Sequence, residues 1–159
     1  MSFPGIPSLD AAVMAFVQTH FHNTVTDTVF PIITSLGEAG IGWIVLSLVL
    51  LCFKKTRRTG GLVLIAMTVT LLFGELTLKN IICRLRPCNV FTDFPMLIAR
   101  PTSYSFPSGH TSSSFAAALI LTLRHKKVGW LAYIPAVLIA FSRIFLFVHY
   151  PTDVLAGIL

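Results

Sequence analysis

The segment Phe106-Pro107-Ser108-Gly109-His110-Thr111 stands directly before a long apolar run, residues 112–123. This order predicts the start of a membrane-spanning helix, where the first backbone N–H groups are unpaired and lie at the positive end of the helix dipole. Such an N-terminus suits a phosphate group, and the small residues Ser108 and Gly109 let the backbone approach an anion closely. His110 can accept or release a proton near neutral pH. By itself, however, a Pro-Ser-Gly sequence is equally typical of a plain turn and helix cap.

The composition is that of a membrane protein. Of 159 residues, 55% are hydrophobic and 11% charged, and the mean hydropathy is +0.82. Soluble domains carry about 25% charged residues, so we expect one membrane-embedded domain over residues 1–159. The net charge of +6 comes from short basic clusters between apolar runs, which indicates topology signals and anion ligands and argues against a nucleic-acid partner. The three cysteines form no C-x-x-C pair, and their spacing leaves open whether Cys83 and Cys88 pair or stay free thiols.

The apolar runs predict an all-α, polytopic membrane helical bundle with about five transmembrane helices. An N-terminal segment, residues 1–36, contains a helix at 8–22, capped by Ser8 or Asp10, that is too short to span and is expected to lie as an amphipathic helix at the membrane interface. Residues 23–40 are a mixture of polar and apolar residues and contain a turn at 36–40. In the helical core, residues 37–159, spans are expected at 41–53 with a few preceding residues, 61–78, 110–123 and 128–148. A fifth helix begins at Pro151 and is incomplete at Leu159.

Basic residues predict the orientation of these spans. Residues 54–58 and 124–127 hold four and three Lys/Arg respectively, whereas residues 1–53 hold none. The positive-inside rule places both basic stretches in the cytoplasm. The connection over residues 80–109 then lies on the outer face, together with the end of the fourth span.

Three polar clusters are expected to meet on that outer face. They contribute Glu75, Lys79 and Arg86 from the second span's end, Ser108, Gly109 and His110 from the third span's start, and Arg143, His149 and Asp153 from the fourth span's end. Crowded cations require an anion among them, and arginine forks match phosphate oxygens in a bidentate manner. A carboxylate four residues after a histidine can fix the imidazole tautomer, which leaves the other ring nitrogen as a nucleophile. A second histidine can serve the leaving group, so the clusters predict metal-free phosphoryl transfer.

Each of these residues also has a simpler interpretation. Lys79 and Arg86 are explained separately as snorkelling or stop-transfer charges, His149 as an interfacial histidine, and Asp153 as an acid at a helix N-terminus. Glu75 most simply pairs with Lys79, which lies four residues away on the same helix face. These interpretations would have to hold together at matched positions in three segments, which favours a common site.

The motifs Lys79-x6-Arg86-Pro87, Pro107-Ser108-Gly109-His110 and Ser142-Arg143-x5-His149-x3-Asp153 resemble, in order and spacing, the three signature motifs of the type 2 phosphatidic acid phosphatase superfamily. The resemblance covers residues 60–159 and implies a helical core with phosphatase activity that needs no metal or other cofactor and proceeds through a phosphohistidine. It implies that His149 is the nucleophile, that Asp153 orients it, and that His110 protonates the leaving group and then activates water. It also implies a phosphate-binding pocket, formed by Lys79, Arg86, Ser108, Gly109 and Arg143. The spacing of Glu75 from Lys79, and not the resemblance, makes Glu75 the expected anchor of Lys79.

The composition favours the membrane branch of this family over its soluble acid phosphatases and vanadium haloperoxidases. A site at the membrane face suits a lipid phosphate whose tail stays in the bilayer among other membrane lipids. The small size resembles bacterial members acting on undecaprenyl diphosphate, phosphatidylglycerophosphate or phosphatidic acid, and an outward site in a bacterial plasma membrane fits carrier recycling in cell-wall synthesis. Two alternatives stay open: a phosphotransferase with the same site, and a non-catalytic lipid-binding membrane protein. The sequence indicates no oligomeric state.

Overall fold

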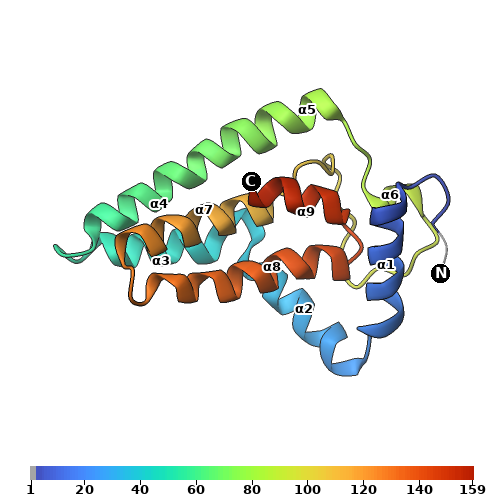
Figure 1. The fold of residues 1–159 in the computed structure, drawn as a ribbon, viewed down its shortest axis with the longest axis horizontal. Helices are drawn as coiled ribbons and strands as arrows, with labels where there is room; N and C mark the ends of the chain where they lie inside the picture. Colours follow the sequence, from blue (N-terminus) through green and yellow to red (C-terminus); the bar gives the residue numbers. More distant parts are fainter. Residues whose placement is uncertain (1–2) are drawn as a thin grey trace.

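The computed structural model describes residues 3–159, and every regular element within them is helical (Figure 1). In chain order the elements are α1 (Ser8–His20), α2 (Thr24–Leu36), η1 (Glu38–Gly40), α3 (Ile41–Leu51), α4 (Arg57–Thr70), η2 (Leu71–Leu78), α5 (Lys79–Ile82), α6 (Pro87–Val90), α7 (Gly109–Arg124), η3 (Gly129–Ala132), α8 (Tyr133–Phe145) and α9 (Pro151–Ile158). The expected all-α class is confirmed.

The bundle is built from α3, α4, α7 and α8, which run side by side along the long axis (Figure 1). Small residues on α7 allow this close packing, because Ala117 and Ala118 are fully buried against Trp43 of α3 and Val63 of α4. The Trp43 indole Nε1 donates a hydrogen bond to Ser114 Oγ, 2.9 Å away. The polar end of this large side chain is therefore satisfied inside the apolar core.

Large apolar side chains cover the outside of the bundle. Val45, Leu48, Ile65, Phe73 and Leu76 are all exposed, as expected for surfaces that contact lipid. One helical stretch of the described residues, Arg57–Val90, is by itself long and apolar enough to cross a membrane. The pair Thr24–Leu36 and Glu38–Leu51 forms a second such stretch if it counts as one span across its 46° bend.

The helix α2 was not predicted, because Pro31 and the mixed composition of residues 23–40 obscure it. The structure shows a capping box at its start: Asn23 Oδ1 accepts hydrogen bonds from the backbone N–H groups of Val25 (2.9 Å) and Thr26 (3.1 Å), and Thr26 Oγ1 accepts one from the Asn23 N–H (3.0 Å). The expected turn follows, where Gly40 has a φ of +70°. This turn carries the chain from α2 into α3 and places η1 beside the start of α7.

The N-terminal helix α1 has the expected bounds to within two residues, but its expected cap was wrong. Pro7 precedes the helix, and no side chain caps its first N–H groups. Asp10 is instead fully buried against α9, where its Oδ1 accepts a hydrogen bond from the Thr152 N–H (2.9 Å). Since Gln18 also donates to the Phe145 carbonyl oxygen (3.0 Å), α1 is fastened across the ends of α8 and α9 (Figure 1).

The second predicted span, 61–78, is longer in the structure and changes its helical type. The helix starts at Arg57 and continues to Ile82, and its segment η2 is a π-helix. Such wider turns are rare in proteins as a whole, and those that occur lie frequently at functional sites. Beyond it, Cys83 is an exposed free thiol and Cys88 a buried one, so the two do not pair.

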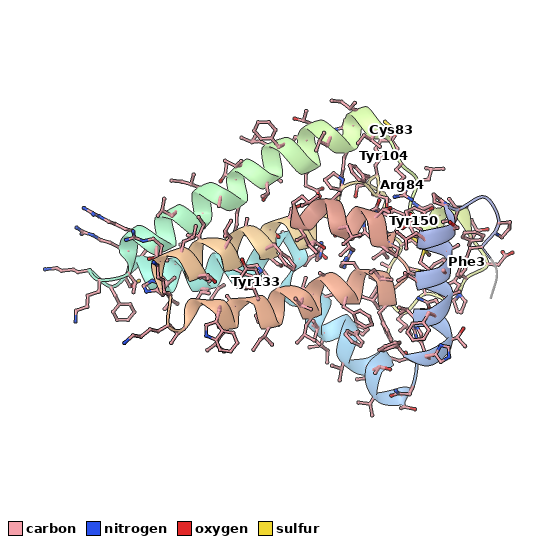
Figure 2. All side chains as sticks on the ribbon, viewed as in Figure 1. Phe3, Cys83, Arg84, Tyr104, Tyr133 and Tyr150 are labelled. Carbon is pink, nitrogen blue, oxygen red and sulfur yellow. The ribbon has the colours of Figure 1, made fainter. Side chains whose placement is uncertain are left out.

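Basic side chains gather at the end of the bundle where α4 starts (Figure 2), and the polar clusters of the three motifs lie toward the other end. This separation along the helices is the arrangement that the sequence predicted.

Candidate active site

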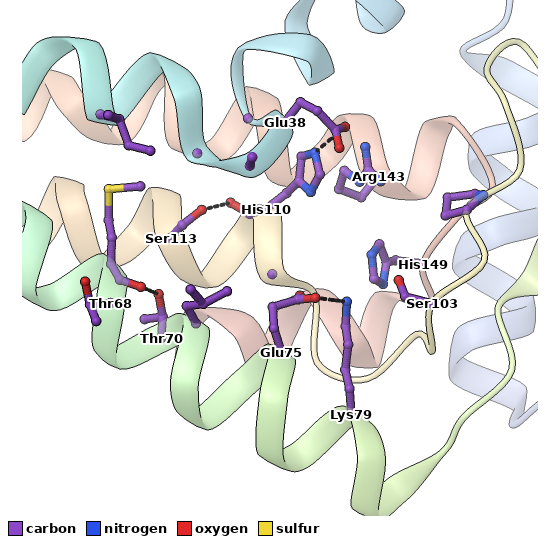
Figure 3. A pocket seen from close by; sticks show the side chains of 18 of the residues that line it. Glu38, Thr68, Thr70, Glu75, Lys79, Ser103, His110, Ser113, Arg143 and His149 are labelled. Carbon is purple, nitrogen blue, oxygen red and sulfur yellow. Dashed lines mark hydrogen bonds and ion pairs between the residues drawn. The ribbon is translucent and has the colours of Figure 1, made fainter.

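A cavity of about 670 Å³ opens between α4, η2, α7 and η1, and α8 closes one side of it. Its polar end brings together Lys79 of α5, Arg86 before α6, His110 of α7, Arg143 of α8 and His149 of the α8–α9 connection (Figure 3). All three predicted motifs therefore contribute side chains to one cavity.

Three cations line this end and are almost fully buried. The exposed fractions of Lys79, Arg86 and Arg143 are 5%, 3% and 3%. Lys79 Nζ forms an ion pair with Glu75, 2.6 Å away, as expected for this i,i+4 pair. Among residues 3–159, neither Arg86 nor Arg143 has a carboxylate within ion-pair distance, and Arg143 Nε lacks any hydrogen-bond partner. Buried guanidinium groups without a carboxylate in contact are costly, which favours an anion between them.

Arg86 is held rigidly against the imidazole of His149. Its Nε and Nη2 donate to the carbonyl oxygen (2.8 Å) and hydroxyl (2.9 Å) of Ser103, and its Nη1 donates to the Val148 carbonyl oxygen (3.0 Å). Nη1 also lies 2.8 Å from His149 Nε2. Arginine has only donors, so Nε2 must accept, and the imidazole proton resides on Nδ1. The Nε2 lone pair therefore points at the cationic end of the cavity.

The opposite ring nitrogen of His149 faces a carboxylate and a hydroxyl. Nδ1 lies 3.5 Å from Asp153 Oδ2 and 3.4 Å from Ser105 Oγ, and Ser105 donates a hydrogen bond to the same Oδ2. The Tyr150 N–H donates to Oδ2 as well, over 2.9 Å. Asp153 is thus held behind His149 and does not itself line the cavity. The spacing of Asp153 from His149 made this carboxylate predictable, whereas a lone serine in a loop, such as Ser105, carries no spacing signal.

The environment of His149 keeps its imidazole neutral. The side chain is 1% exposed. This burial, reinforced by the nearby charges of Arg86 and Arg143, lowers the pKa of His149 well below its ordinary value. At neutral pH Nε2 is therefore unprotonated, which is the state that a nucleophile requires, and its lone pair accepts the hydrogen bond from Arg86.

His110 lies on the far side of the cavity from Lys79 (Figure 3). Its Nε2 is 3.5 Å from Glu38 Oε2 and makes no hydrogen bond, so the two groups form an ion pair only when His110 is protonated. The ring packs closely on Gly37, where an added Cβ would lie 2.8 Å from His110 Cδ2. Glu38 was not among the predicted residues, because it belongs to a turn that the sequence connects to no motif.

Ser108 and Gly109 occupy different places relative to the cavity. Gly109 lines it, whereas Ser108 is fully buried outside the lining. The Ser108 N–H donates to the Asp153 carbonyl oxygen (3.1 Å), and its hydroxyl accepts from Thr111 Oγ1 (2.9 Å). Ser108 therefore joins the start of α7 to α9.

Gly109 provides a first test of the site. A Cβ added there would lie 2.0 Å from Glu75 Oε1, so Gly109→Ala must displace the carboxylate that pairs with Lys79. We expect kcat/KM for phosphate release to fall by about 10²-fold, as for small misplacements of reacting groups. The melting temperature should change little, because the colliding atom ends a flexible side chain.

The matched control is Gly61→Ala in α4, where an added Cβ meets nothing within 4 Å. This substitution should preserve activity and stabilise the helix by up to about 1 kcal/mol. If both variants release phosphate at the parent rate, close backbone approach at Gly109 is not needed.

The cavity continues away from the cations as an apolar groove. Ile44 of α3 and Leu64, Met67 and Leu71 of the α4–η2 helix line this part. One cavity therefore joins a polar, cationic end to an apolar passage between helices whose outer faces are themselves apolar.

Residues 59–159 match the PAP2 superfamily, and the chain belongs to this family. It is 39% identical over 116 residues to an undecaprenyl-diphosphatase of Sulfolobus acidocaldarius, covering 72% of this chain and 56% of that protein. It is 32% identical over 146 residues to undecaprenyl-diphosphatase BcrC of Bacillus subtilis, covering 86% of this chain and 70% of the relative.

The fold agrees with this assignment. The crystal structure of a transmembrane PAP2-type phosphatidylglycerolphosphate phosphatase from Bacillus subtilis superposes with a TM-score of 0.75 and 29% identity, covering 98% of this chain and 80% of that one. The chain is therefore a membrane protein of the PAP2 superfamily that spans little more than half the length of its Sulfolobus relative.

Proposed function

We propose that the chain is a metal-independent lipid phosphatase that hydrolyses a lipid phosphate or diphosphate through a phosphohistidine. The observation that carries the proposal is the pair of buried guanidiniums of Arg86 and Arg143, without carboxylate partners within ion-pair distance in residues 3–159, beside the unprotonated Nε2 of His149. Undecaprenyl diphosphate is the leading substrate, since two relatives are undecaprenyl-diphosphatases. Phosphatidylglycerophosphate and phosphatidic acid are the other members of the substrate class.

The reaction follows from the placement of the two histidines. His149 Nε2 attacks phosphorus, forming a P–N bond while the P–O bond to the lipid breaks, and His110 donates a proton to the departing oxygen. His110 then takes a proton from water, whose oxygen attacks phosphorus while the P–N bond breaks, which returns the electron pair to His149 Nε2 and releases phosphate. Asp153 stabilises the imidazole charge at Nδ1 throughout.

The developing negative charge on the phosphoryl oxygens is met by groups fixed before the substrate arrives. These are Lys79, Arg86, Arg143 and the Gly109 N–H, with Ser108 as a further donor if its contacts rearrange on binding. Such preorganised donors supply the largest electrostatic part of catalysis. Glu75 holds Lys79 in place until phosphate arrives.

The membrane placement is part of the same proposal. We place residues 1–36 at the interface and residues 37–159 in a single core of about five spans. The separation of the basic loops from the cavity supports an active site on the outer face of a bacterial plasma membrane. The apolar groove between α3 and α4 would then keep the lipid tail in the bilayer while the headgroup meets the cations.

The test is phosphate release by the purified protein in detergent and EDTA, comparing the three lipids, with His149→Ala as the blank. Release that the blank lacks supports the histidine mechanism, and the preferred lipid identifies the substrate. Activity that chelation abolishes and metal restores would overturn the metal-independent mechanism. Release only into an added lipid or sugar acceptor would indicate a phosphotransferase, and binding without turnover a non-catalytic lipid-binding protein.

A further inference from the structure

A buried charge network connects α1 to the carboxylate behind His149. Arg84, two residues before Arg86, donates from Nη1 to Asp153 Oδ1 (2.6 Å) and from Nη2 to Asp10 Oδ2 (2.7 Å). Both carboxylates are fully buried, whereas the Arg84 side chain is 24% exposed. One guanidinium therefore bridges two carboxylates that come from opposite ends of the chain.

The Arg84 side chain is also fixed from its other face. Its guanidinium carbon lies 3.7 Å from the centre of the Tyr150 ring, and the two residues are neighbours in Figure 2. A guanidinium stacked on an aromatic ring and forked between two carboxylates has little freedom to move. Arg84 can therefore hold Asp153 in a defined position.

Asp10 extends the network to the start of α9. Its Oδ1 accepts the Thr152 N–H (2.9 Å) and its Oδ2 accepts the Thr152 hydroxyl (2.7 Å), while Thr152 Oγ1 accepts a further bond from Arg84 (2.8 Å). A carboxylate on a free N–H in the first turn stabilises a helix start. The helix α1 thus supplies a capping anion to α9, the helix that carries Asp153.

The two oxygens of Asp153 have different partners. Oδ2 faces His149 and Ser105, and Oδ1 faces Arg84. A cation on Oδ1 draws negative charge away from the side that faces the imidazole, and Asp10 in turn offsets the charge of Arg84. A merely structural link between α1 and α9 would need only the bonds between Asp10 and Thr152.

We propose that Arg84 and Asp10 are positioning residues for phosphoryl transfer, which fix the place and charge of Asp153 and thereby couple helix α1 to the nucleophile His149. The inference rests on the proposed function. Neither residue lines the cavity, so both act through Asp153 and leave substrate binding untouched.

The charged and titratable groups around the nucleophile come from every neighbouring element. In contact with His149 are Arg86 and Asp153; around the cavity are Glu38, Glu75, Lys79, His110 and Arg143; behind Asp153 are Asp10, Arg84 and Tyr150, with Cys88 buried nearby. Variants at Arg84 and Asp10 change only the groups behind Asp153. A change in pH dependence therefore reports this network.

The experiment measures kcat and KM against pH for Arg84→Met, Arg84→Lys and Asp10→Asn in detergent, with the lipid that the parent protein hydrolyses best. Arg84→Met should lower kcat by about 10²-fold, since Asp153 Oδ1 loses the guanidinium that holds it and only the contacts of Oδ2 remain. Loss of this cation favours protonated His149, so the acid side of the kcat profile should move to higher pH. Asp10→Asn removes a negative charge and should move it to lower pH, with a smaller loss of kcat.

Arg84→Lys separates charge from geometry. A lysine keeps the cation, so the acid side of the profile should stay near that of the parent. Its single nitrogen cannot bridge both carboxylates as a fork does, so kcat should still fall. KM should stay near the parent value in all three variants.

The matched control is Asp27→Asn, which removes the 2.7 Å pair between Asp27 and His22 without touching Asp153. It should keep the parent kcat and pH profile. Titration of the ¹⁵N-labelled imidazole of His149 by NMR in the protein without substrate provides a readout independent of turnover. The titration midpoint of His149 should move to higher pH in Arg84→Met and to lower pH in Asp10→Asn.

The inference is overturned if the Arg84 and Asp10 variants lose thermal stability while kcat and both pH readouts stay at parent values, or if KM alone rises. This failure differs from that of the proposed function. A parent protein that releases no phosphate refutes the phosphatase, whereas the NMR titration still decides whether Arg84 and Asp10 govern His149.

Discussion

Replacing His149 by alanine is expected to abolish phosphate release, with a loss of at least about 10⁴-fold in kcat, as for the removal of a nucleophile in other covalent mechanisms. No other described side chain combines an unprotonated nitrogen with a 2.8 Å contact to a buried guanidinium of the cavity. The phosphorylated protein should disappear as well, because the P–N bond can no longer form. The measurement is acid-quenched labelling with a ³²P-lipid beside steady-state phosphate release.

His20→Ala is the control for histidine loss. His20 is exposed on α1 and its Nδ1 contacts only the Phe16 carbonyl oxygen, 2.9 Å away. This variant should keep both turnover and labelling. Substantial labelling in His149→Ala would show that phosphate is carried on another residue, and the proposed role of His149 would have to be given up.

The motif residues of the candidate site could be predicted because chemistry restricts them. Lys79, Arg86 and Arg143 are cations in or beside apolar helices, where a charge is rare without a function. The basic stretches at 54–58 and 124–127 indicated that the helix ends with the three motifs share the opposite side of the membrane. The structure brings those motif ends into one cavity.

The supporting residues could not be predicted in the same way. Ser105 and Glu38 lie in a loop and a turn, and only the folded chain brings them to His149 and His110. Nothing in the sequence distinguishes Arg84 from the other loop charges, and its role rests on its contacts with Asp10 and Asp153 in the folded chain. Contacts across 69 and 74 residues depend on how α1 and α9 pack, which no local pattern encodes.

Local helix signals explain where the observed helices differ from the predicted ones. The structure shows a capping box at Asn23 and Thr26 that starts α2, whereas in the sequence Pro31 and the mixture of polar and apolar residues over 23–40 obscure this helix. The π-helical stretch η2 has the same apolar composition as an ordinary helix, so its widened turns were not predictable.

Replacing His110 by alanine should slow turnover by about 10²–10⁴-fold, the usual contribution of general acid–base catalysis. Unlike His149→Ala, this variant retains the nucleophile and its partners Arg86 and Asp153. Both the departure of the lipid oxygen and the activation of water lose their proton carrier. The phosphohistidine should therefore still form, slowly, and persist longer than in the parent.

An activated aryl phosphate such as p-nitrophenyl phosphate separates the two roles of His110, because its leaving group departs without protonation. In His110→Ala it should phosphorylate His149 at nearly the parent rate and release a burst of one nitrophenolate per protein. Steady release should then stay slow, because water attack still lacks a base. If the variant instead turned over the aryl ester steadily at the parent rate, His110 would serve only the leaving group, and the group that activates water would have to be sought elsewhere along the cavity, first at Glu38, whose carboxylate lies 3.5 Å from His110 Nε2.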